Sequence, residues 1–452
     1  MSNSAETESQ QQRATLMELL REEDDSRLAR AAAGVHPADL AELLDSLDEN
    51  DGKLRLFGVL TAEHGSEVMR HVGDATRGLL QDNLSDARLA TIVEHLDTDD
   101  ATDLLGELPE DRQQELLDQT SPETRKDVEE LLAYPEDSAG GIMKTEVAVV
   151  GATATVRDIT EYLRHRGDEF HDIHQVFVTG ERNRLLGSIP LRRLLLARDS
   201  TPAERIMETD LVSVRTDLDQ EEVAHLFEKY DVVSVPVVDS LGRVCGRITI
   251  DDIVDVIEEE ATEDMLRLAG VAGESVEVAD PIHGVRSRLP WLALDLIATA
   301  ASAAVVAMFE GTIQTIAIAA ALMTIVARQG GNAGLQTLTL IVRGLAVGQI
   351  ETSQALRIVG RECVVALANG TALGLTAGGV VYVWRGDLAL SVVLGSAMVL
   401  NFLIAAILGT LVPLGLKAVN VDPAVSSSVF VTAGTDMLGF FIFLGLLSLV
   451  VQ

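Results

Sequence analysis

The chain contains few cysteines and few basic residues for its length. Cys245 and Cys363 are the only cysteines among 452 residues, which excludes a disulfide framework and a CxxC metal site. Lys and Arg number 35 against 70 Asp and Glu, and this acidity excludes the basic stripes that nucleic-acid binding requires. Residues 1–13 are polar and lack an apolar core, so we expect a disordered tail without a signal peptide.

The excess negative charge lies in the first part of the chain. Residues 1–285 carry 27 Lys and Arg against 63 Asp and Glu, whereas residues 286–452 carry 8 against 7. The first part is therefore an acidic, water-soluble region that attracts cations or is adapted to a salty cytoplasm, and composition does not separate these two interpretations. The second part is apolar and typical of a lipid-embedded domain. Neither part contains a catalytic constellation, so we do not expect an enzyme.

Residues 14–133 have the spacing of amphipathic helices. Leu40, Leu43, Leu44 and Leu47 share one face, and the same i, i+3, i+4 pattern returns along the segment. Short breaks, several with proline, separate the helices, and Asp, Ser or Thr often precedes a new one. The pattern predicts an all-α acidic domain with a superhelical arrangement.

Residues 140–257 contain an internal repeat. Residues 142–147 (IMKTEV) align with 206–211 (IMETDL), and residues 184–189 (RLLGSI) align with 243–248 (RVCGRI). Each unit reads as strand, helix, strand, glycine turn, strand and helix. The arrangement resembles a tandem pair of α/β CBS domains, a sensing module that binds nucleotides or metals. No sharp nucleotide motif is present, so ATP binding at the CBS repeats is left open.

A run of acids, residues 251–264, ends the second repeat. On a helix the acids fall on two faces, one with Asp252, Asp255 and Glu259 and one with Glu260, Glu263 and Asp264. Stacked like charges destabilise a helix unless cations neutralise them. The run is either a solvated acidic helix or part of a site for hard cations, which prefer oxygen ligands. Facing carboxylates would come from the helical domain, for example Asp99 and Asp103.

The apolar region predicts five transmembrane helices, at about 289–309, 311–342, 354–384, 388–417 and 424–451. Lys and Arg near the ends of the spans place the N-terminal domains in the cytoplasm and the C-terminus outside. The inner flanks hold Arg286, Arg288, Arg343, Arg357, Arg361 and Lys417, and the outer flanks hold Arg385. We therefore expect a multi-pass protein of the cell membrane.

Polar residues within the spans indicate an ion path. Asp436 lies near the middle of the last span, where an acid costs about 2.5–3.5 kcal/mol on insertion scales and marks an ion pathway by default. Asn332 stands among glycines in residues 330–334 (GGNAG), which permit close backbone approach or a bent helix. Glu362, near the inner end of the third span, fits a pore vestibule or the surface equally well. Gly370, Gly374 and Gly378 form two overlapping GxxxG steps, for which we expect a role in helix packing.

Several stretches together are specific to one family: residues 131–141 (LLAYPEDSAGG), 251–264, 288–291 (RLPW), 330–336 (GGNAGLQ), 343–344 (RG) and 421–424 (VDPA), followed by Thr435-Asp436. On these residues the chain resembles MgtE-type magnesium channels, also called transporters, along essentially its whole length. The resemblance implies a homodimer in the bilayer with one pore on the dimer axis. It also implies a last-helix aspartate that coordinates hydrated Mg²⁺, which falls on Asp436.

The resemblance further implies that cytosolic Mg²⁺ ions bind the helical domain and the CBS pair and close the pore. The ligands carried over are Asp99, Asp103, Glu221, Asp231, Asp252, Asp255, Glu260, Glu263 and Asp264, and the pore candidates are Asp436, Asn332, Gly331 and Glu362. The expected divisions are 1–13 (tail), 14–133 (helical N domain), 134–200 and 201–262 (CBS), 263–284 (connecting plug helix, about 266–280) and 285–452 (membrane domain).

Two charged residues depart from the family pattern. Arg328 stands beside the GGNAG segment, where relatives carry small or apolar residues, and Asp295 stands where we expect an amide. An Arg328–Asp295 pair beside the pore would restore neutrality. The sequence thus predicts a Mg²⁺-gated, Mg²⁺-selective uptake channel, without separating Mg²⁺ from Co²⁺ or Mn²⁺. The alternative is a coupled secondary transporter of another divalent cation or an anion, regulated by nucleotide binding to the CBS pair.

Overall fold

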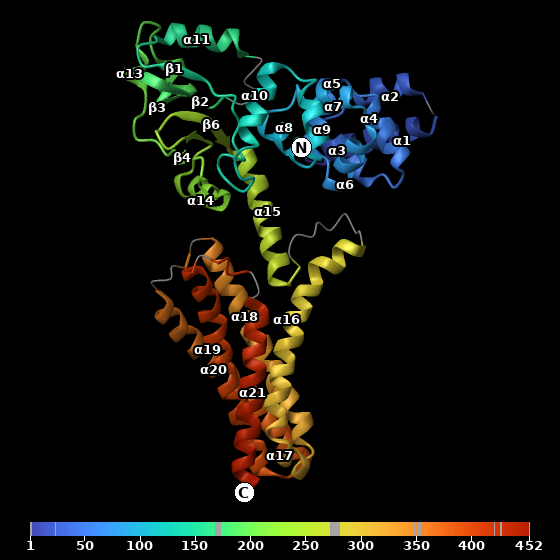
Figure 1. Cartoon of the computed structure of the whole chain (residues 1–452), viewed down its shortest axis with the longest axis vertical. Coiled ribbons are helices and arrows are strands. Elements are labelled where there is room, and N and C mark those ends of the chain that lie inside the picture. The colour runs from blue at the N-terminus through green and yellow to red at the C-terminus, as the bar shows by residue number, and fades with distance from the viewer. Residues whose placement is uncertain are drawn as a thin grey trace. The chain divides into compact units, whose positions relative to one another are not determined.

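The computed structural model describes residues 2–22, 24–167, 173–271, 281–347, 349–350, 354–419, 421–424 and 427–451 (Figure 1). The chain divides into two compact units, Met1–Glu258 and Glu259–Gln452. The first holds the helical domain and the CBS repeats, and the second holds the apolar helices. The predicted fold class is confirmed for all three parts.

Short helices build the N-terminal domain. They are α1 (Ser2–Glu22), α2 (Asp25–Ala32), α3 (Pro37–Ser46), α4 (Asn50–Gly58), α5 (Ala62–His71), α6 (Asp74–Asn83), α7 (Asp86–Val93), α8 (Thr98–Gly106), α9 (Glu110–Leu117) and α10 (Pro122–Leu131). Proline begins α3 and α10, where its missing N–H costs no helical hydrogen bond. Helix α3 packs on α5, α5 on α7 and α7 on α9, so alternate helices stack as a superhelix around buried leucines.

The expected disordered tail is helical instead. Helix α1 begins at Ser2 and runs through residues 2–13 into the leucines that join the core. Glu, Gln and Ala in this segment have high helix propensity. Leu16 and Leu19, which are buried, anchor the helix from its C-terminal half.

The CBS repeats have the predicted element order. The first contains β1 (Val149–Gly151), α11 (Val156–His165), β2 (Gln175–Thr179), β3 (Leu185–Pro190) and α12 (Leu191–Leu196), followed by α13 (Ala203–Ile206). The second contains β4 (Val214–Arg215), α14 (Gln220–Tyr230), β5 (Ser234–Val238), β6 (Val244–Thr249) and α15 (Ile250–Leu268). In each sheet the first two strands are parallel and the last two antiparallel. The central strands β2 and β5 are buried, as their apolar sequences predict.

An extended segment of each repeat pairs with the last strand of the other repeat. Lys144 pairs with Arg247 on β6, and Glu208 pairs with Ser188 on β3. A glycine lies under each crossing, because a Cβ at Gly246 would come within 2.7 Å of the Lys144 carbonyl oxygen. The crossing therefore carries residues of the first repeat onto the second.

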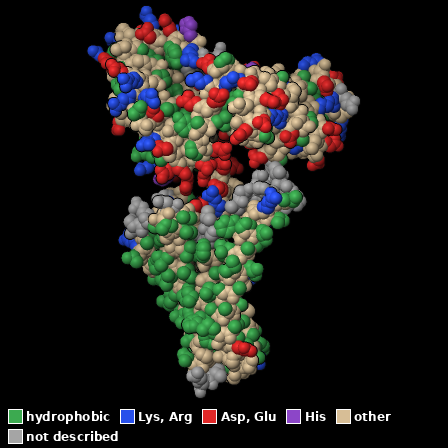
Figure 2. All heavy atoms as spheres, in the orientation of Figure 1, with side chains coloured by type: hydrophobic (Ala, Val, Ile, Leu, Met, Phe, Trp, Pro, Cys, Tyr) green, Lys and Arg blue, Asp and Glu red, His purple; other side chains and the backbone are tan. Residues whose placement is uncertain are grey.

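The second unit contains the C-terminal part of α15 and the long apolar helices. These are α16 (Pro281–Ala307), α17 (Glu310–Thr315), α18 (Ala319–Ala346), α19 (Ala355–Arg385), α20 (Leu388–Ala418) and α21 (Ser427–Val451). Helix α20 packs against α18, α19 and α21, and α21 also contacts α16 and α17. Figure 2 shows hydrophobic side chains covering the outer face of these helices, where lipid would lie. Part of the expected connecting helix, residues 272–280, lies outside the described residues.

Four helices of the described chain are long and apolar enough to cross a membrane: Gly284–Ala307, Ala355–Arg385, Leu388–Ala418 and Ser428–Val450. The expected span 311–342 is instead divided between α17 and α18, with a break between Thr315 and Ala319. Arg328 and Asn332 make α18 more polar than the others, although its inner faces are buried against α20 and α21. A fifth crossing by α18 stays a prediction.

Glycines bring the membrane helices into close contact. A Cβ at Gly374 would lie 2.7 Å from the Gly395 carbonyl oxygen, and one at Gly378 would lie 2.8 Å from the Ser391 carbonyl oxygen. The overlapping GxxxG steps on α19 thus form its interface with α20.

Candidate functional site

Of the pore candidates, Gly331 lies where α18 meets α21. A Cβ added at Gly331 would lie 3.9 Å from Thr435 Oγ1, and one at Gly334 would lie 2.7 Å from Val431 Cγ1. The glycine segment of α18 therefore lies against the turn of α21 that immediately precedes Asp436. Asp436 itself is half-buried. Of the two alternatives for these glycines, the structure shows close approach: α18 stays helical through Gly330–Gly334, and Gly334 lies against Val431 of α21.

The other charged candidates occupy distinct places. Asp295 is exposed on α16, the helix that packs against α21. Arg328 is exposed on α18, and in the described chain it forms no ion pair with Asp295. Glu362 is buried on α19 and pairs with its neighbour Arg361 at 3.0 Å. Asn332 is exposed on α18.

Asn401 is a buried polar residue of the membrane domain that the sequence analysis missed. It lies on α20 with no exposed surface, and its Nδ2 donates to the Val326 carbonyl oxygen at 2.9 Å. Its Oδ1 has no hydrogen-bond partner among the residues that the structure describes. A Cβ at Gly330 would lie 2.0 Å from Asn401 Nδ2, so Gly330 makes room for the amide. An amide within an otherwise apolar span is the signal that would have revealed it.

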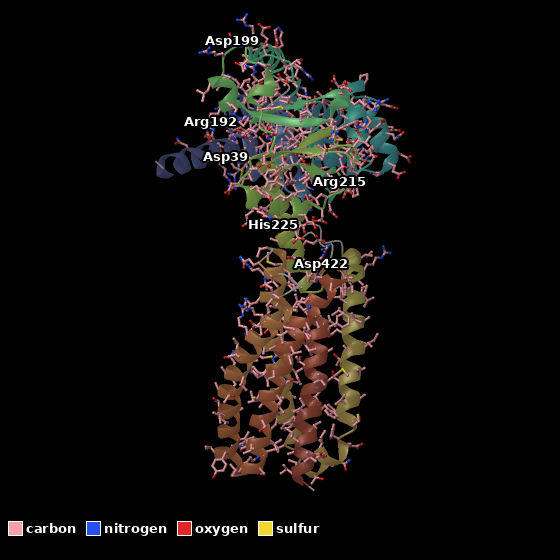
Figure 3. The ribbon with its side chains drawn as sticks, turned by 90° about the vertical axis from the view of Figure 1, so that its left-hand side faces the viewer. Asp39, Arg192, Asp199, Arg215, His225 and Asp422 are labelled. Atoms are coloured by element: carbon pink, nitrogen blue, oxygen red, sulfur yellow. The ribbon has the colours of Figure 1, made fainter. Side chains whose placement is uncertain are left out.

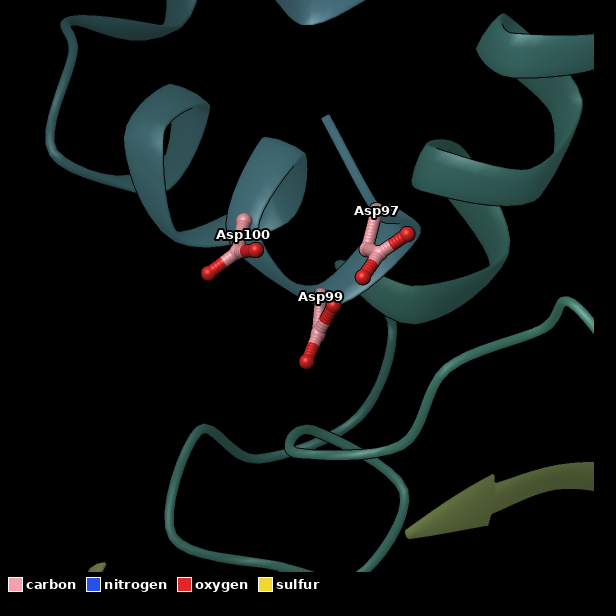
Figure 4. A group of neighbouring side chains, drawn as sticks. All are labelled: Asp97, Asp99 and Asp100. Carbon is pink, nitrogen blue, oxygen red and sulfur yellow. The ribbon is translucent and has the colours of Figure 1, made fainter. Parts of the chain in front are cut away.

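Acids and cations of the first unit meet in a group that we call the lysine cluster: Arg70, Asp97, Asp99, Asp100, Lys144, Asp251 and Asp252. Figure 4 shows its first three acids around the start of α8. Lys144 Nζ lies 2.8 Å from Asp252, 3.3 Å from Asp251, 3.5 Å from Asp97 and 3.9 Å from Asp99, and Lys144 is 2% exposed.

Arg70 is the second cation of the lysine cluster. Its guanidinium lies 3.2 Å from Asp100 and 3.1 Å from Asp251, so it joins α5 to both α8 and α15. Burial raises the pKa of Asp100 to about 7, against the pull of Arg70. Burial opposes the charge of Lys144, but the carboxylates of Asp99 and Asp252 raise its pKa. The cluster therefore holds charged cations among an excess of acids.

The predicted regulatory ligands do not gather into one metal-sized group in the described chain. The oxygens of Asp97, Asp99 and Asp100 lie within 4.8 Å of one another, and of these only Asp99 was predicted. Asp252 lies in the lysine cluster, whereas Asp103 and Asp255 are exposed on α8 and α15. Glu221 lies in the first turn of α14, and Asp231 ends that helix with a φ of +49°.

The last predicted ligands belong to the second unit. Arg267 on α15 pairs with Glu263 and, at 2.5 Å, with Asp422 in the α20–α21 loop. Asp422 lies at one end of the helical bundle (Figure 3). Burial, together with the charges of Asp422 and Glu260, raises the pKa of Asp264 to about 6. These acids outnumber the one described cation among them, so the arrangement can attract a divalent cation.

Family models match most of the chain. The MgtE intracellular N domain matches residues 35–137, the CBS domain matches 139–200 and 203–259, and MgtE, described as a divalent cation transporter, matches 323–446. The chain is 33% identical over 443 residues to a magnesium transporter MgtE of Thermus thermophilus, covering 97% of this chain and 98% of that one. It is 35% identical over 323 residues to one of Enterococcus faecalis, covering 72% and 71%.

Solved structures match the first unit. The cytosolic domain of a Mg²⁺ channel MgtE in complex with ATP aligns with a TM-score of 0.51 at 36% identity, covering 54% of this chain and 99% of that one. The soluble part of a magnesium transporter aligns with a TM-score of 0.52 at 29% identity, covering 56% and 99%.

Proposed function

This chain belongs to the MgtE family of magnesium transporters, and from that membership we propose that it is a Mg²⁺-selective uptake channel closed by cytosolic Mg²⁺. The observation that carries the proposal is the contact between the glycine segment of α18 and the turn before Asp436. This contact supports an ion path lined by the Asp436 carboxylate at the point where α18 and α21 pack closely.

Asp436 would bind the ion through its water shell. Mg²⁺ is small, holds its waters tightly and usually keeps several of them when protein-bound. A carboxylate at membrane depth attracts the hydrated cation electrostatically without having to strip it. The charge of Asp295 adds to that attraction, while polar groups such as Asn332 would contact the waters.

The pore would form between two copies of the chain. Asp436 is half-buried and Asn332 is exposed in the single chain, so neither is enclosed by its own helices. A homodimer would place two Asp436 carboxylates around one hydrated ion, and the paired negative charge would match the dication. The cytosolic unit would face the inside and the C-terminus the outside, as the Lys and Arg distribution favours.

Closure would follow from differential affinity. Acids on α15 and near the α20–α21 loop repel one another, and bridging Mg²⁺ would stabilise the arrangement that brings them together. The closed state would then gain binding energy that the open state lacks. The residues that would hold regulatory ions are Glu221, Asp231, Asp255, Glu260, Glu263 and Asp264, with Asp103 on the helical domain. We also propose that ATP binds the CBS repeats, which the ATP complex of the cytosolic domain of a similar protein supports.

Flux in liposomes tests the proposal. Asp436→Asn should abolish Mg²⁺ uptake down a gradient, because it removes the membrane-embedded charge. Asp387→Asn is the matched control, since Asp387 caps α20 through the Leu390 N–H at 3.0 Å and lies at the end of the span. Uptake that survives Asp436→Asn would refute the pore assignment.

The alternative, a coupled secondary transporter of another divalent cation or an anion, predicts a different result. Uptake would then require a Na⁺ or H⁺ gradient, whereas a channel needs only the Mg²⁺ gradient. For gating, the triple variant Asp255→Asn, Glu260→Gln, Asp264→Asn should stay active at internal Mg²⁺ concentrations that close the parent protein. Unchanged closure would show that these acids are not the sensor.

A further inference from the structure

The buried ammonium of Lys144 lies where two predicted regulatory ligands, Asp99 and Asp252, converge. We propose that Lys144 is a built-in cation that replaces Mg²⁺ at this position, so that the helical domain is held on the second CBS repeat without metal. This proposal deepens the regulatory part of the proposed function and rests on it. It leaves Mg²⁺ sensing to the other acids.

Both carboxylate oxygens of Asp252 already have partners within the protein. Its Oδ1 lies 2.8 Å from Lys144 Nζ, and its Oδ2 accepts hydrogen bonds from the Thr249 N–H at 3.0 Å and the Thr249 hydroxyl at 2.7 Å. Mg²⁺ demands near-octahedral oxygen ligands at about 2.0–2.1 Å and carries its own waters. A dication at Asp252 would have to displace the ammonium or sit beside it. The donor set therefore does not fit a regulatory Mg²⁺ between Asp99 and Asp252.

Both the backbone and the side chain of Lys144 are held in place. Its backbone N–H donates to the Arg247 carbonyl oxygen at 2.8 Å, and its carbonyl oxygen accepts from the Arg247 N–H at 2.9 Å. The residue is 2% exposed, so the stem as well as the ammonium is enclosed. A mobile surface lysine can leave a metal site, but this one is held by the segment crossing onto β6.

The internal repeat supplies an independent comparison. Lys144 corresponds to Glu208, and Asp252 corresponds to Arg193, in the alignment of the two repeats. Glu208 and Arg193 also form an ion pair, at 2.7 Å, with the charges exchanged. In both repeats the side chains at these two positions thus form a direct ion pair. A contact that holds without a metal ion requires such a pair.

The Arg193–Glu208 and Lys144–Asp252 ion pairs differ in their exposure to solvent. Side chains of Arg193 and Glu208 are 45% and 42% exposed, whereas those of Lys144 and Asp252 are 2% and 9% exposed. The first turn of α8 adds Asp97 and Asp99 around Lys144. The ammonium therefore bridges the CBS pair to the helical domain, which is the role otherwise expected of a regulatory ion.

A distance measurement on the full-length protein in liposomes tests the proposal. Spin labels would replace Glu63 on α5 and Glu228 on α14, both exposed, after Cys245 and Cys363 are changed to serine. In the unsubstituted background the short interdomain distance should persist in EDTA, with a docked fraction within about twofold of that in millimolar Mg²⁺. Loss of the short distance in EDTA would overturn the proposal, and this arm depends on no lysine variant.

Lys144→Gln should make docking depend on Mg²⁺. The variant should lose the short distance in EDTA and regain it in millimolar Mg²⁺, a change of at least about tenfold in docked fraction. Lys126→Gln is the control, because Lys126 is 74% exposed and pairs only with its neighbour Asp127 among the described residues. A Lys144→Gln protein that stays docked in EDTA would overturn the proposal. The measurement involves no transport, so failure of Mg²⁺ conduction would leave it unaffected.

Discussion

Gly378 and Gly379 are neighbours on α19, but only Gly378 faces another helix. A Cβ at Gly378 would lie 2.8 Å from the Ser391 carbonyl oxygen, whereas one at Gly379 would meet nothing within 4 Å. Gly→Ala raises helix propensity by about 1 kcal/mol at either position. At Gly378 the new methyl must also push α19 away from α20, and overpacking of this kind costs about 1–3 kcal/mol. The difference between Gly378→Ala and Gly379→Ala should therefore be about 1–3 kcal/mol.

Unfolding in mixed detergent and SDS micelles measures this difference. The two tryptophans of the chain, Trp291 and Trp384, lie on α16 and α19 and report on the membrane domain. Gly374→Ala should repeat the loss, because its Cβ would lie 2.7 Å from the Gly395 carbonyl oxygen. Equal stability of the Gly378 and Gly379 variants would refute the packing argument, since propensity alone predicts no difference between them.

Three further predictions concern charges and a buried amide. Asp295→Asn should raise the Mg²⁺ concentration for half-maximal flux by roughly three- to tenfold, equivalent to about 0.7–1.4 kcal/mol, without abolishing uptake; an unchanged value would show that Asp295 does not help Asp436 to attract the ion. Because the pKa of Asp100 is raised to about 7, the folded chain binds this proton more tightly than the unfolded chain, so stability should rise as pH falls from 8 to 6. The thermal midpoint should gain roughly 2–4 °C, and Asp100→Asn should remove the gain; an identical slope in the variant would contradict this. Asn401→Ala should cost about 1–3 kcal/mol through the void it leaves, whereas Asn401→Leu should stay within about 1 kcal/mol, because the single hydrogen bond to Val326 contributes little in a membrane. Equal losses in SDS unfolding would assign the effect to the hydrogen bond instead.

The elements that the sequence predicted well are those specified by local pattern. The CBS repeats follow from residues 142–147 and 206–211, whose spacing fixes the crossing segments, and the α19–α20 contact follows from glycines four residues apart. Each of these patterns also indicates what the segment packs against. A strand must pair with other strands in a sheet, and a GxxxG face packs closely against a second helix. Such patterns therefore predict architecture as well as secondary structure.

The shape of α18 was harder to predict. Glycine weakens helices in water, and Gly330, Gly331 and Gly334 permitted either a bend or close backbone approach. The helix nevertheless continues through these glycines, and the missing side chains allow close packing against α20 and α21. The break falls instead between α17 and α18. Nothing in the composition of residues 316–318, which are isoleucine and alanine, marks it.

In the lysine cluster two predicted ligands, Asp99 and Asp252, meet a lysine that a search for acidic residues alone does not reveal. The carboxylates on the helical faces predicted ligands at Asp99 and Asp252. The cation that contacts them is Lys144, which lies 107 residues before Asp251 in the sequence. The repeat alignment contained the missing information, because it sets Lys144 opposite Glu208 and Asp252 opposite Arg193. A charge reversal at both members of a pair preserves attraction, as a direct contact between the two side chains requires. Complementary charge between equivalent positions of a repeat is therefore a signal that indicates an internal ion pair.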